Sequence, residues 1–257
     1  MAISRYLQQR EIKRENHPPI VIAADSMSQG SLVAIKSIPL PSELNTNSLK
    51  CIKAAERYLS LNHPNLASPV DVFIDPKTPG QIKLVAEFIA GESTLTASRH
   101  LSTDGFLNFL GQVCSVLHYL HARGFAHLDI HPGNLLLLPP THTVPRWSLK
   151  LIDVPFLNLR AYLEYRDILS FSPSYAAPEI LNGERFDHRA DMYSLGVLLF
   201  QLLVGDLPFG SNTDISTSRH QDLLDDSRID LITPEFLGPI VRKLLSPEQE
   251  RRYTSAH

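Results

Sequence analysis

The chain has 257 residues, of which 43% are hydrophobic and 20% are charged. This composition excludes a disordered chain and suits one large or two small folded domains. Two cysteines, Cys51 and Cys114, allow at most one disulfide, which argues against a disulfide-stabilised secreted fold and favours the reducing cytoplasm. A formal net charge of -3 gives no electrostatic reason to expect nucleic acid. The longest apolar stretch, 192–204, is interrupted by polar residues and is too short to span a membrane.

Alternating apolar residues, separated by turn-forming clusters, predict antiparallel strands in the first ninety residues. A single amphipathic helix is expected between the second and third of these strands, over residues 48–61. The strands are expected at 20–25, 31–38, 67–74 and 81–89.

The hydrophobic period becomes helical after Gly91. Helices are expected over 106–123, 190–204 and 234–245, with a polar connection over 207–232. The sequence therefore predicts an α+β protein in which a small β-rich lobe precedes a larger helical lobe.

The segment 127–134, HLDIHPGN, ends the long helix and precedes two apolar runs, LLLLPP and WSLKLID. If these runs pair as a hairpin, Asn134 and Asp153 become neighbours, and Asp129 lies a few residues away. One carboxylate could then accept a proton, while two oxygen donors suit a hard cation such as Mg²⁺. Taken alone, the segment is also compatible with an ordinary helix exit.

Several motifs in this order resemble the eukaryotic-type protein kinase family over about residues 5–256. The resemblance implies one protein kinase-like domain of two lobes over 1–257, with 1–89 as the small lobe and hinge and 90–257 as the large lobe. The motifs that carry it are VAIK (33–36), HLDIHPGN (127–134), IDVP (152–155), SPSYAAPE (172–179) and DMYSLGVLLFQLLVGDLPF (191–209).

The resemblance implies ATP and Mg²⁺ as cofactors and assigns four catalytic groups. Lys36 would hold the α- and β-phosphates, and Asp129 would orient or deprotonate the acceptor hydroxyl. Asn134 and Asp153 would bind Mg²⁺.

The same resemblance places adenine at the hinge, 87–89, where the backbone of Glu87 and Ile89 would meet its edge. Val21, Ala34 and Leu136 would pack against its faces. Ala86 would occupy the gatekeeper position, so the pocket behind adenine is expected to be roomy.

The glycine-rich loop of the family is missing. Counted back from Val21, its three glycines fall on Arg14, Asn16 and Pro19. Pro18 and Pro19 have no backbone N–H for a phosphate and restrict the backbone. Nucleotide binding is therefore expected to be weak.

The glutamate that should pair with Lys36 is also in doubt, because the ungapped position is Ala54. Glu56 lies two residues further, about 200° around the helix, and would need a helix shift to reach Lys36. Its role is left open. Val154 and Pro155 replace a phenylalanine and a glycine of the metal-binding loop.

Two departures lie in the segment 127–134, which corresponds to the catalytic loop of the family. Leu128 replaces the arginine that reads phosphorylation of the activation segment. His131 replaces a lysine that contacts the transferring phosphoryl group. A histidine here resembles the loop of aminoglycoside- and choline-type phosphotransferases, so this departure does not imply inactivity.

In the following segment, Ser172 takes the place of a threonine typical of Ser/Thr-directed enzymes. Glu179 and Arg252 are expected to form a buried ion pair.

The eleven histidines are not expected to form a zinc site, because His118, His121, His127 and His131 lack further ligands at zinc-binding spacing.

Taken together, these motifs and departures favour a Ser/Thr protein kinase whose activity is weak or partner-dependent. A pseudokinase, acting as an interaction module for a regulatory protein partner, is the alternative, and a small-molecule phosphotransferase is a third. His257 arrives where the family has one more helix, so the sequence is compatible with an excerpt of a longer multidomain chain.

Overall fold

The computed structural model describes residues 5–14, 17–40, 49–78, 80–155, 171–209 and 226–256. The chain divides into two compact units. The first contains the described residues as far as Ala90 together with 153–155, and the second contains Gly91–Ile152 and the described residues from Phe171 onward.

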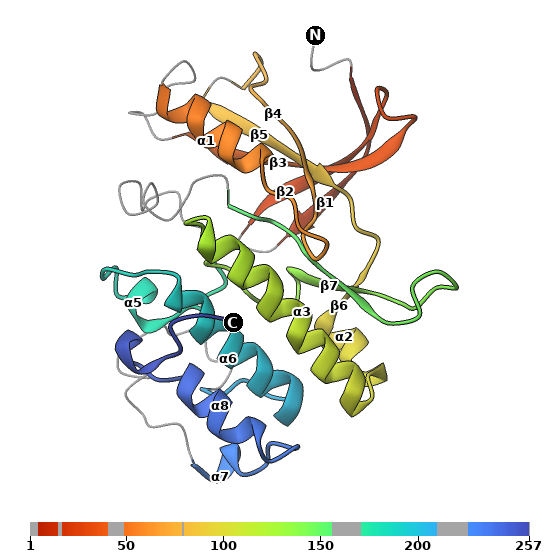
Figure 1. Cartoon of the computed structure of the whole chain (residues 1–257). Coiled ribbons are helices and arrows are strands. Elements are labelled where there is room, and N and C mark those ends of the chain that lie inside the picture. Colours follow the sequence, from red (N-terminus) through yellow and green to blue (C-terminus); the bar gives the residue numbers. More distant parts are fainter. Residues whose placement is uncertain are drawn as a thin grey trace. The chain divides into compact units, whose positions relative to one another are not determined.

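The first unit is built on a five-stranded antiparallel sheet in the order β1-β2-β3-β5-β4 (Figure 1). The four strands expected from the sequence are present, and each begins or ends within three residues of the expected bounds. The strands are β1 (Tyr6–Arg14), β2 (His17–Asp25), β3 (Ser31–Pro39), β4 (Pro69–Phe73) and β5 (Gln81–Glu87).

One helix, α1 (Leu49–Leu59), accompanies this sheet and corresponds to the expected helix 48–61. Its Cys51 and Tyr58 are buried, whereas Glu56 is exposed, as its amphipathic pattern requires. One face of the sheet carries an apolar cluster of Tyr6, Ala23, Val33, Ile35 and Val85.

Strand β1 was not expected from the sequence, and ion pairs hold its beginning in place. Arg5 donates two hydrogen bonds to the carboxylate of Asp25, at 2.8 and 2.7 Å, and a third to Asp71 at 3.1 Å. The Tyr6 hydroxyl donates to the same Asp71 at 2.8 Å, and the Tyr6 ring stacks on Phe73. These contacts tie the start of β1 to the end of β2 and to β4.

The second unit begins with β6 (Glu92–Ser93) and α2 (Thr94–Ala97), followed by a 3₁₀ turn at Ser98–His100. A three-stranded sheet then has the order β6-β7-β8. The strands β7 (Leu135–Leu138) and β8 (Ser148–Leu151) pair with Leu135 opposite Leu151. The expected hairpin after the catalytic loop is therefore confirmed.

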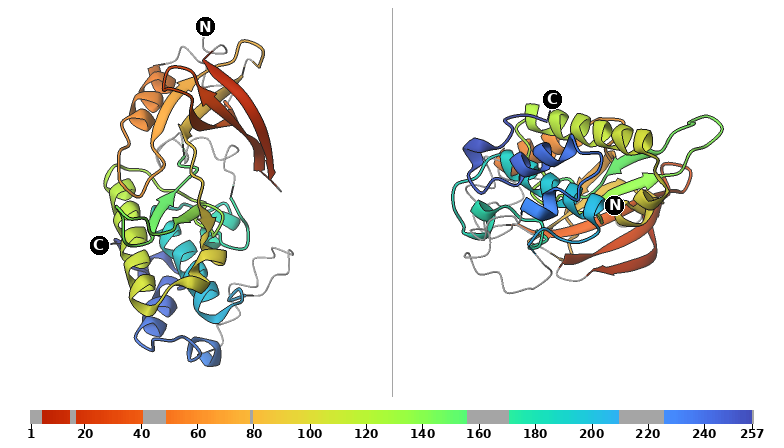
Figure 2. Two further views of the ribbon diagram at one scale, coloured as in Figure 1. Left: turned by 90° about the vertical axis from the view of Figure 1, so that its right-hand side faces the viewer. Right: turned by 90° about the horizontal axis from the view of Figure 1, so that it is seen from below.

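Three longer helices build most of the second unit (Figures 1 and 2). Helix α3 (Thr103–Ala122) starts three residues before the expected bound, because the Ser102 hydroxyl caps it by accepting the Gly105 N–H at 3.2 Å. Helix α6 (Arg189–Val204) is buried almost throughout and ends at Gly205, which adopts the left-handed conformation. Helix α8 (Leu237–Leu244) packs against α6.

The tight approach of α6 to α8 explains Gly196. A Cβ atom at this position would lie 2.8 Å from the Cβ of Leu244, so a side chain would force the helices apart. Short helical segments complete the unit: α5 (Pro178–Leu181), α7 (Asp226–Ile229) and a 3₁₀ turn at Gln249–Arg251. Most of the expected polar connection, 210–225, lies outside the described residues. No helix in the described part of the chain has the length and apolar character needed to cross a membrane.

Candidate active site

The segment 127–134, which was expected to be the catalytic loop, is anchored within the second unit by Asp191 of α6. Both carboxylate oxygens of Asp191 accept backbone N–H groups, from His127 at 2.8 Å and from Leu128 at 2.7 Å. Leu128 has a φ of 64°, a left-handed conformation that is strained for a leucine. The two hydrogen bonds to Asp191 hold the loop in this conformation and so set the direction of the next residue, Asp129.

Helix α3 supplies a third donor to the same carboxylate. His121 Nε2 lies 2.7 Å from Asp191 Oδ2. Burial alone would raise the pKa of Asp191, but the hydrogen bond and charge of His121 and the amide of Leu128 hold that pKa below its ordinary value. The sequence placed Asp191 in the motif 191–209 but assigned it no role of its own, although a charged residue in a helix this apolar was an available signal.

Asp129 is itself fixed by neighbouring donors. Asn134 Nδ2 donates to the backbone carbonyl of Asp129 at 2.9 Å and to its Oδ2 at 3.1 Å. The backbone N–H of Ser172 donates to Oδ1 at 2.7 Å. Both side chains are buried, so this carboxylate has a defined orientation. Asp129 and Asn134 thus lie together as the sequence predicted, and Ser172 joins them.

Ile152 and Asp153, which begin the segment expected to bind metal, are each held by contacts within their own unit. Within the second unit, the Ile152 N–H donates to the Asn134 carbonyl at 2.9 Å, and the Ile152 carbonyl faces His127 Nε2 at 2.9 Å. Within the first unit, Lys36 Nζ lies 2.7 Å from Asp153 Oδ1. Asp153 has a φ of 63°, another left-handed backbone at a proposed functional residue.

The Lys36–Asp153 ion pair bears on the open question of the helix glutamate. Glu56 is exposed on α1, so the sequence alternative in which it reaches Lys36 does not describe this structure. Ala54 is half-buried between Cys51 and Tyr58 on the inner side of the helix, since residues three and four apart share a face. The recorded negative partner of Lys36 is therefore Asp153.

The strand register corrects one expected adenine contact. Val21 pairs with Ile35 and packs on the apolar cluster of the sheet, whereas Ala34 pairs with Ile22. Since paired residues point to the same face of a sheet and neighbouring residues of a strand to opposite faces, Val21 and Ala34 lie on opposite faces of the sheet. The expectation that both pack against adenine is therefore wrong for this register.

The strand pairing also shows which residues lie on the same face of the sheet as Lys36. Ile12 pairs with Ile20, Ile20 pairs with Lys36, and Lys36 pairs with Leu84. Since Ile20 rather than Val21 lies on the face of Lys36, the three glycine positions of the family are counted back from Ile20. They then fall on Lys13, Glu15 and Pro18, and none of these is glycine. Of the positions first expected, Asn16 lies outside the described residues.

The expected hinge follows β5. The Glu87 N–H donates to the Ser68 carbonyl at 2.9 Å, and the Phe88 N–H donates to the Leu32 carbonyl at 3.2 Å. Ala86 lies opposite Ala34 in the sheet, so a small side chain does occupy the expected gatekeeper position on that face. Ile89 is buried in the first unit, and Leu136 is half-buried on β7 in the second.

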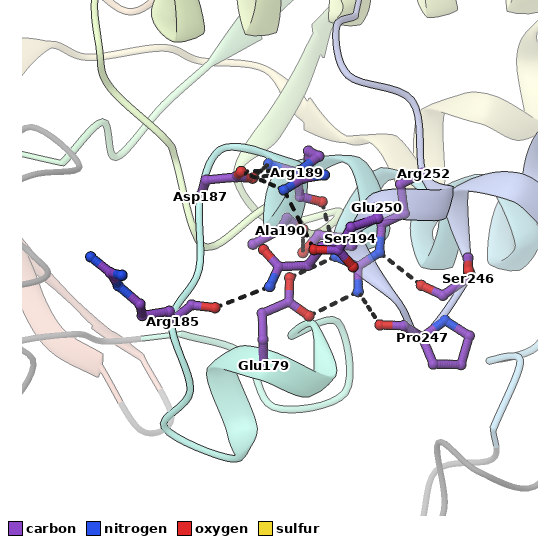
Figure 3. Close-up of polar contacts among 11 residues, drawn as sticks. Glu179, Arg185, Asp187, Arg189, Ala190, Ser194, Ser246, Pro247, Glu250 and Arg252 are labelled. Carbon is purple, nitrogen blue, oxygen red and sulfur yellow. Dashed lines mark hydrogen bonds and ion pairs between the residues drawn. The ribbon is translucent and has the colours of Figure 1, made fainter.

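The expected ion pair between Glu179 and Arg252 is present (Figure 3). The two guanidinium nitrogens lie 2.6 and 2.8 Å from the carboxylate oxygens, and both side chains are almost completely buried. Arg252 also donates to the backbone carbonyls of Arg189, Ser246 and Pro247. This contact fixes the segment that follows Ser172 to the last described turn of the chain.

Comparison with known proteins agrees with this geometry. The sequence profile described as "Protein kinase domain" matches residues 20–257. Death-associated protein kinase 2 of Mus musculus is 30% identical over 79% of this chain and 56% of its own length. Serine/threonine-protein kinase Pkn1 of Myxococcus xanthus is 33% identical over 91% of this chain and 34% of its own length. The chain thus spans about half of the first relative and a third of the second.

A solved structure supports the fold independently. Rad53 residues 1–466, crystallised in complex with AMP-PNP, has a TM-score of 0.74, covers 99% of this chain and is 20% identical, while this chain covers 64% of that one. At that identity the likeness concerns the fold alone. The profile match over residues 20–257 shows that this chain belongs to the eukaryotic-type protein kinase family, and the anchored loop and the α+β architecture agree with it.

Proposed function

We propose that this chain transfers the γ-phosphoryl group of ATP to serine or threonine hydroxyl groups of proteins. The observation that carries the proposal is the fixed carboxylate of Asp129, which is held by Asn134 and by the backbone of Ser172. Phosphoryl transfer depends mainly on positioning and charge stabilisation, so an ordered acceptor site is its first requirement. The Ser/Thr kinases among the relatives support the hydroxyl class.

Each remaining residue has one role in this reaction. The acceptor oxygen forms a bond to the γ-phosphorus while its proton passes to Asp129, and the bond from that phosphorus to the β,γ-bridging oxygen breaks, so ADP leaves. Lys36 would neutralise the α- and β-phosphates. The backbone of Glu87 and Ile89 would bind the edge of adenine, with Ala34 and Leu136 against its faces.

Asn134 and Asp153 would hold Mg²⁺, and their chemistry fits that ion. Both hydrogen bonds from Asn134 Nδ2 run to Asp129, which turns the amide so that its oxygen is the atom offered to a cation. A carboxylate and an amide oxygen are ligands that Mg²⁺ accepts, with phosphate oxygens supplying others. When bound, the ion would neutralise phosphate charge.

We propose that this activity is weak or dependent on a partner. The segment 14–19, which stands in place of the family's glycine-rich loop and is called the lid here, has no glycine. Its prolines lack the N–H groups that would contact phosphate. Losing two such charge-assisted hydrogen bonds, each of about 1.5–3 kcal/mol, would lower nucleotide affinity by roughly two to four orders of magnitude. The exposed position of Glu56 removes a further support of Lys36.

The same two observations favour one alternative, a pseudokinase that serves as an interaction module. We further propose that 1–257 is a single catalytic domain within a longer chain that acts in the cytoplasm on protein substrates or with a regulatory protein partner. Cys51 and Cys114 are both free thiols, which agrees with a reducing environment.

Incubating the purified chain with millimolar Mg-ATP and a mixture of serine- and threonine-containing peptides tests the proposal. Phosphopeptide should form with the unchanged chain and not with Asp129→Asn. A thermal shift caused by ATP should require Mg²⁺ and should disappear in Asp153→Ala. Peptide phosphorylation no greater than that of Asp129→Asn would reject the kinase and leave the interaction module.

A further inference from the structure

The side chain of His131 is held in one tautomer. Its Nδ1 accepts the backbone N–H of Gly133 at 3.1 Å. A nitrogen that accepts a hydrogen bond keeps its lone pair, so the ring proton of the neutral imidazole lies on Nε2. His131 therefore presents a donor, at Nε2, rather than an acceptor.

The ring lies close to Gly133 and to Tyr175. A Cβ atom on Gly133 would lie 2.8 Å from His131 Cε1 and 3.2 Å from Nδ1, closer than such atoms approach. The ring of Tyr175 lies against the imidazole, with 5.9 Å between centroids, and the Tyr175 hydroxyl is tied to Gln201 at 2.6 Å. A side chain at position 133 would therefore displace the histidine ring.

The fixed donor faces the carboxylate of Asp129. His131 Nε2 lies 3.6 Å from Asp129 Oδ2, which is too long for a direct hydrogen bond. An oxygen atom about 2.8 Å from both could make a hydrogen bond of normal length to each. Asp129 Oδ1 accepts the Ser172 N–H and Oδ2 accepts from Asn134 Nδ2, and a carboxylate oxygen can accept more than one hydrogen bond. The imidazole is about one-fifth exposed, so an incoming group can reach it.

We propose that His131 positions the acceptor hydroxyl: its Nε2–H donates to the hydroxyl oxygen while that hydroxyl donates its own hydrogen to Asp129 Oδ2. The role rests on the kinase function proposed above. It differs from that of the lysine in related proteins, because the short ring tied to Gly133 serves the acceptor and not the phosphoryl group. The loss of His131 should then affect the peptide substrate and spare the nucleotide.

Steady-state kinetics of the full chain with its best peptide from the serine mixture test this role. His131→Ala should lower kcat/KM for the peptide about tenfold, the value of one hydrogen bond, with the KM for ATP within about twofold of that of the unchanged chain. His131→Asn, whose amide can accept from Gly133 and still offer an N–H, should retain more kcat/KM than His131→Ala.

A double-mutant cycle separates this role from a general loss of structure. Gly133→Ala should impair peptide phosphorylation where His131 is present and have little further effect in His131→Ala, because the new methyl group acts by displacing the ring. Gly111→Ala in α3 is the matched control, because its Cβ would meet no atom within 4 Å. Additive effects of the two substitutions would overturn the proposal.

Nitrogen NMR of the histidine rings gives a readout that needs no turnover. The His131 signal should report a protonated Nε2 and a bare Nδ1, and Gly133→Ala should move it. A proton on Nδ1 refutes the geometry. Phosphorylation by the unchanged chain, together with an unaltered kcat/KM for His131→Ala, rejects only this role, whereas no phosphorylation at all rejects the kinase proposal and this role together.

Discussion

The buried ion pair between Glu179 and Arg252 gives the sharpest stability prediction. Their side chains are 2% and 0% exposed, and the guanidinium is enclosed by the carboxylate and three backbone carbonyls. Glu179→Gln keeps the shape of the side chain but leaves the positive charge of Arg252 without a counter-charge. Removing one partner of a buried pair in this way costs about 3–5 kcal/mol.

That cost can be converted into a melting temperature. A chain of this size loses roughly 2–4 °C for each kcal/mol, so Glu179→Gln should melt about 6–20 °C lower in a thermal denaturation assay. The matched control is Asp206→Asn, which breaks an ion pair to Arg228 at 3.2 Å in which Asp206 is 67% exposed. It should cost at most about 1 kcal/mol, because water screens an exposed pair.

A paired replacement tests the electrostatic reasoning itself. Glu179→Leu combined with Arg252→Met removes both charges and should be less destabilising than Glu179→Gln alone, since no uncompensated charge remains. If Glu179→Gln melts within about 2 °C of the unchanged chain, the pair is not acting as a buried charge pair and the reasoning fails.

Two further predictions concern the first unit. Ala54→Glu, on the inner side of α1, should give Lys36 a second carboxylate and tighten Mg-ATP binding about tenfold, as measured by the nucleotide-dependent thermal shift. Ile52→Glu, at an exposed position of the same helix, is the control, and equal effects of both would contradict the assigned face. The hydrogen bonds from Arg5 hold the pKa of Asp25 well below its ordinary value, against the opposing effect of burial. The stability that the ionised Asp25 supplies is therefore complete above about pH 4 and is lost as the pH falls through the pKa of Asp25 in the folded state. Arg5→Met should shift that loss to higher pH in urea unfolding, and an unchanged pH profile would argue against the pair.

The catalytic loop could be predicted from sequence because its chemistry is local. Asp129 and Asn134 are five residues apart on one loop, and the hairpin that follows brings Ile152 beside Asn134, so spacing alone placed these groups. The anchor of the loop could not be found in this way. Asp191 contacts His127 across 64 residues, and the charge that makes Asp191 unusual in an apolar helix does not tell which loop it contacts.

The error at Val21 has a different cause. The run IVIAA in β2 is apolar throughout, so it lacks the alternation that tells which residues face which side of the sheet. A shift of one residue exchanges the two faces, and only the pairing with β3 decides between them.

Strand β1 was missed because it is an edge strand with mostly polar and charged residues, which natural proteins use to protect such edges.

The departures from the family that concern nucleotide binding lie in the first unit, namely the lid without glycine and Ala54 in place of the helix glutamate. In the second unit, Leu128 and His131 depart from the family. The anchor at Asp191, the orientation of Asp129 and the Glu179–Arg252 pair lie in the second and are intact. Since the second set does not depend on the first, divergence should raise the KM for ATP far more than it lowers kcat at saturating nucleotide. A partner that strengthens nucleotide binding by the first unit would then restore activity by lowering that KM, with kcat almost unchanged.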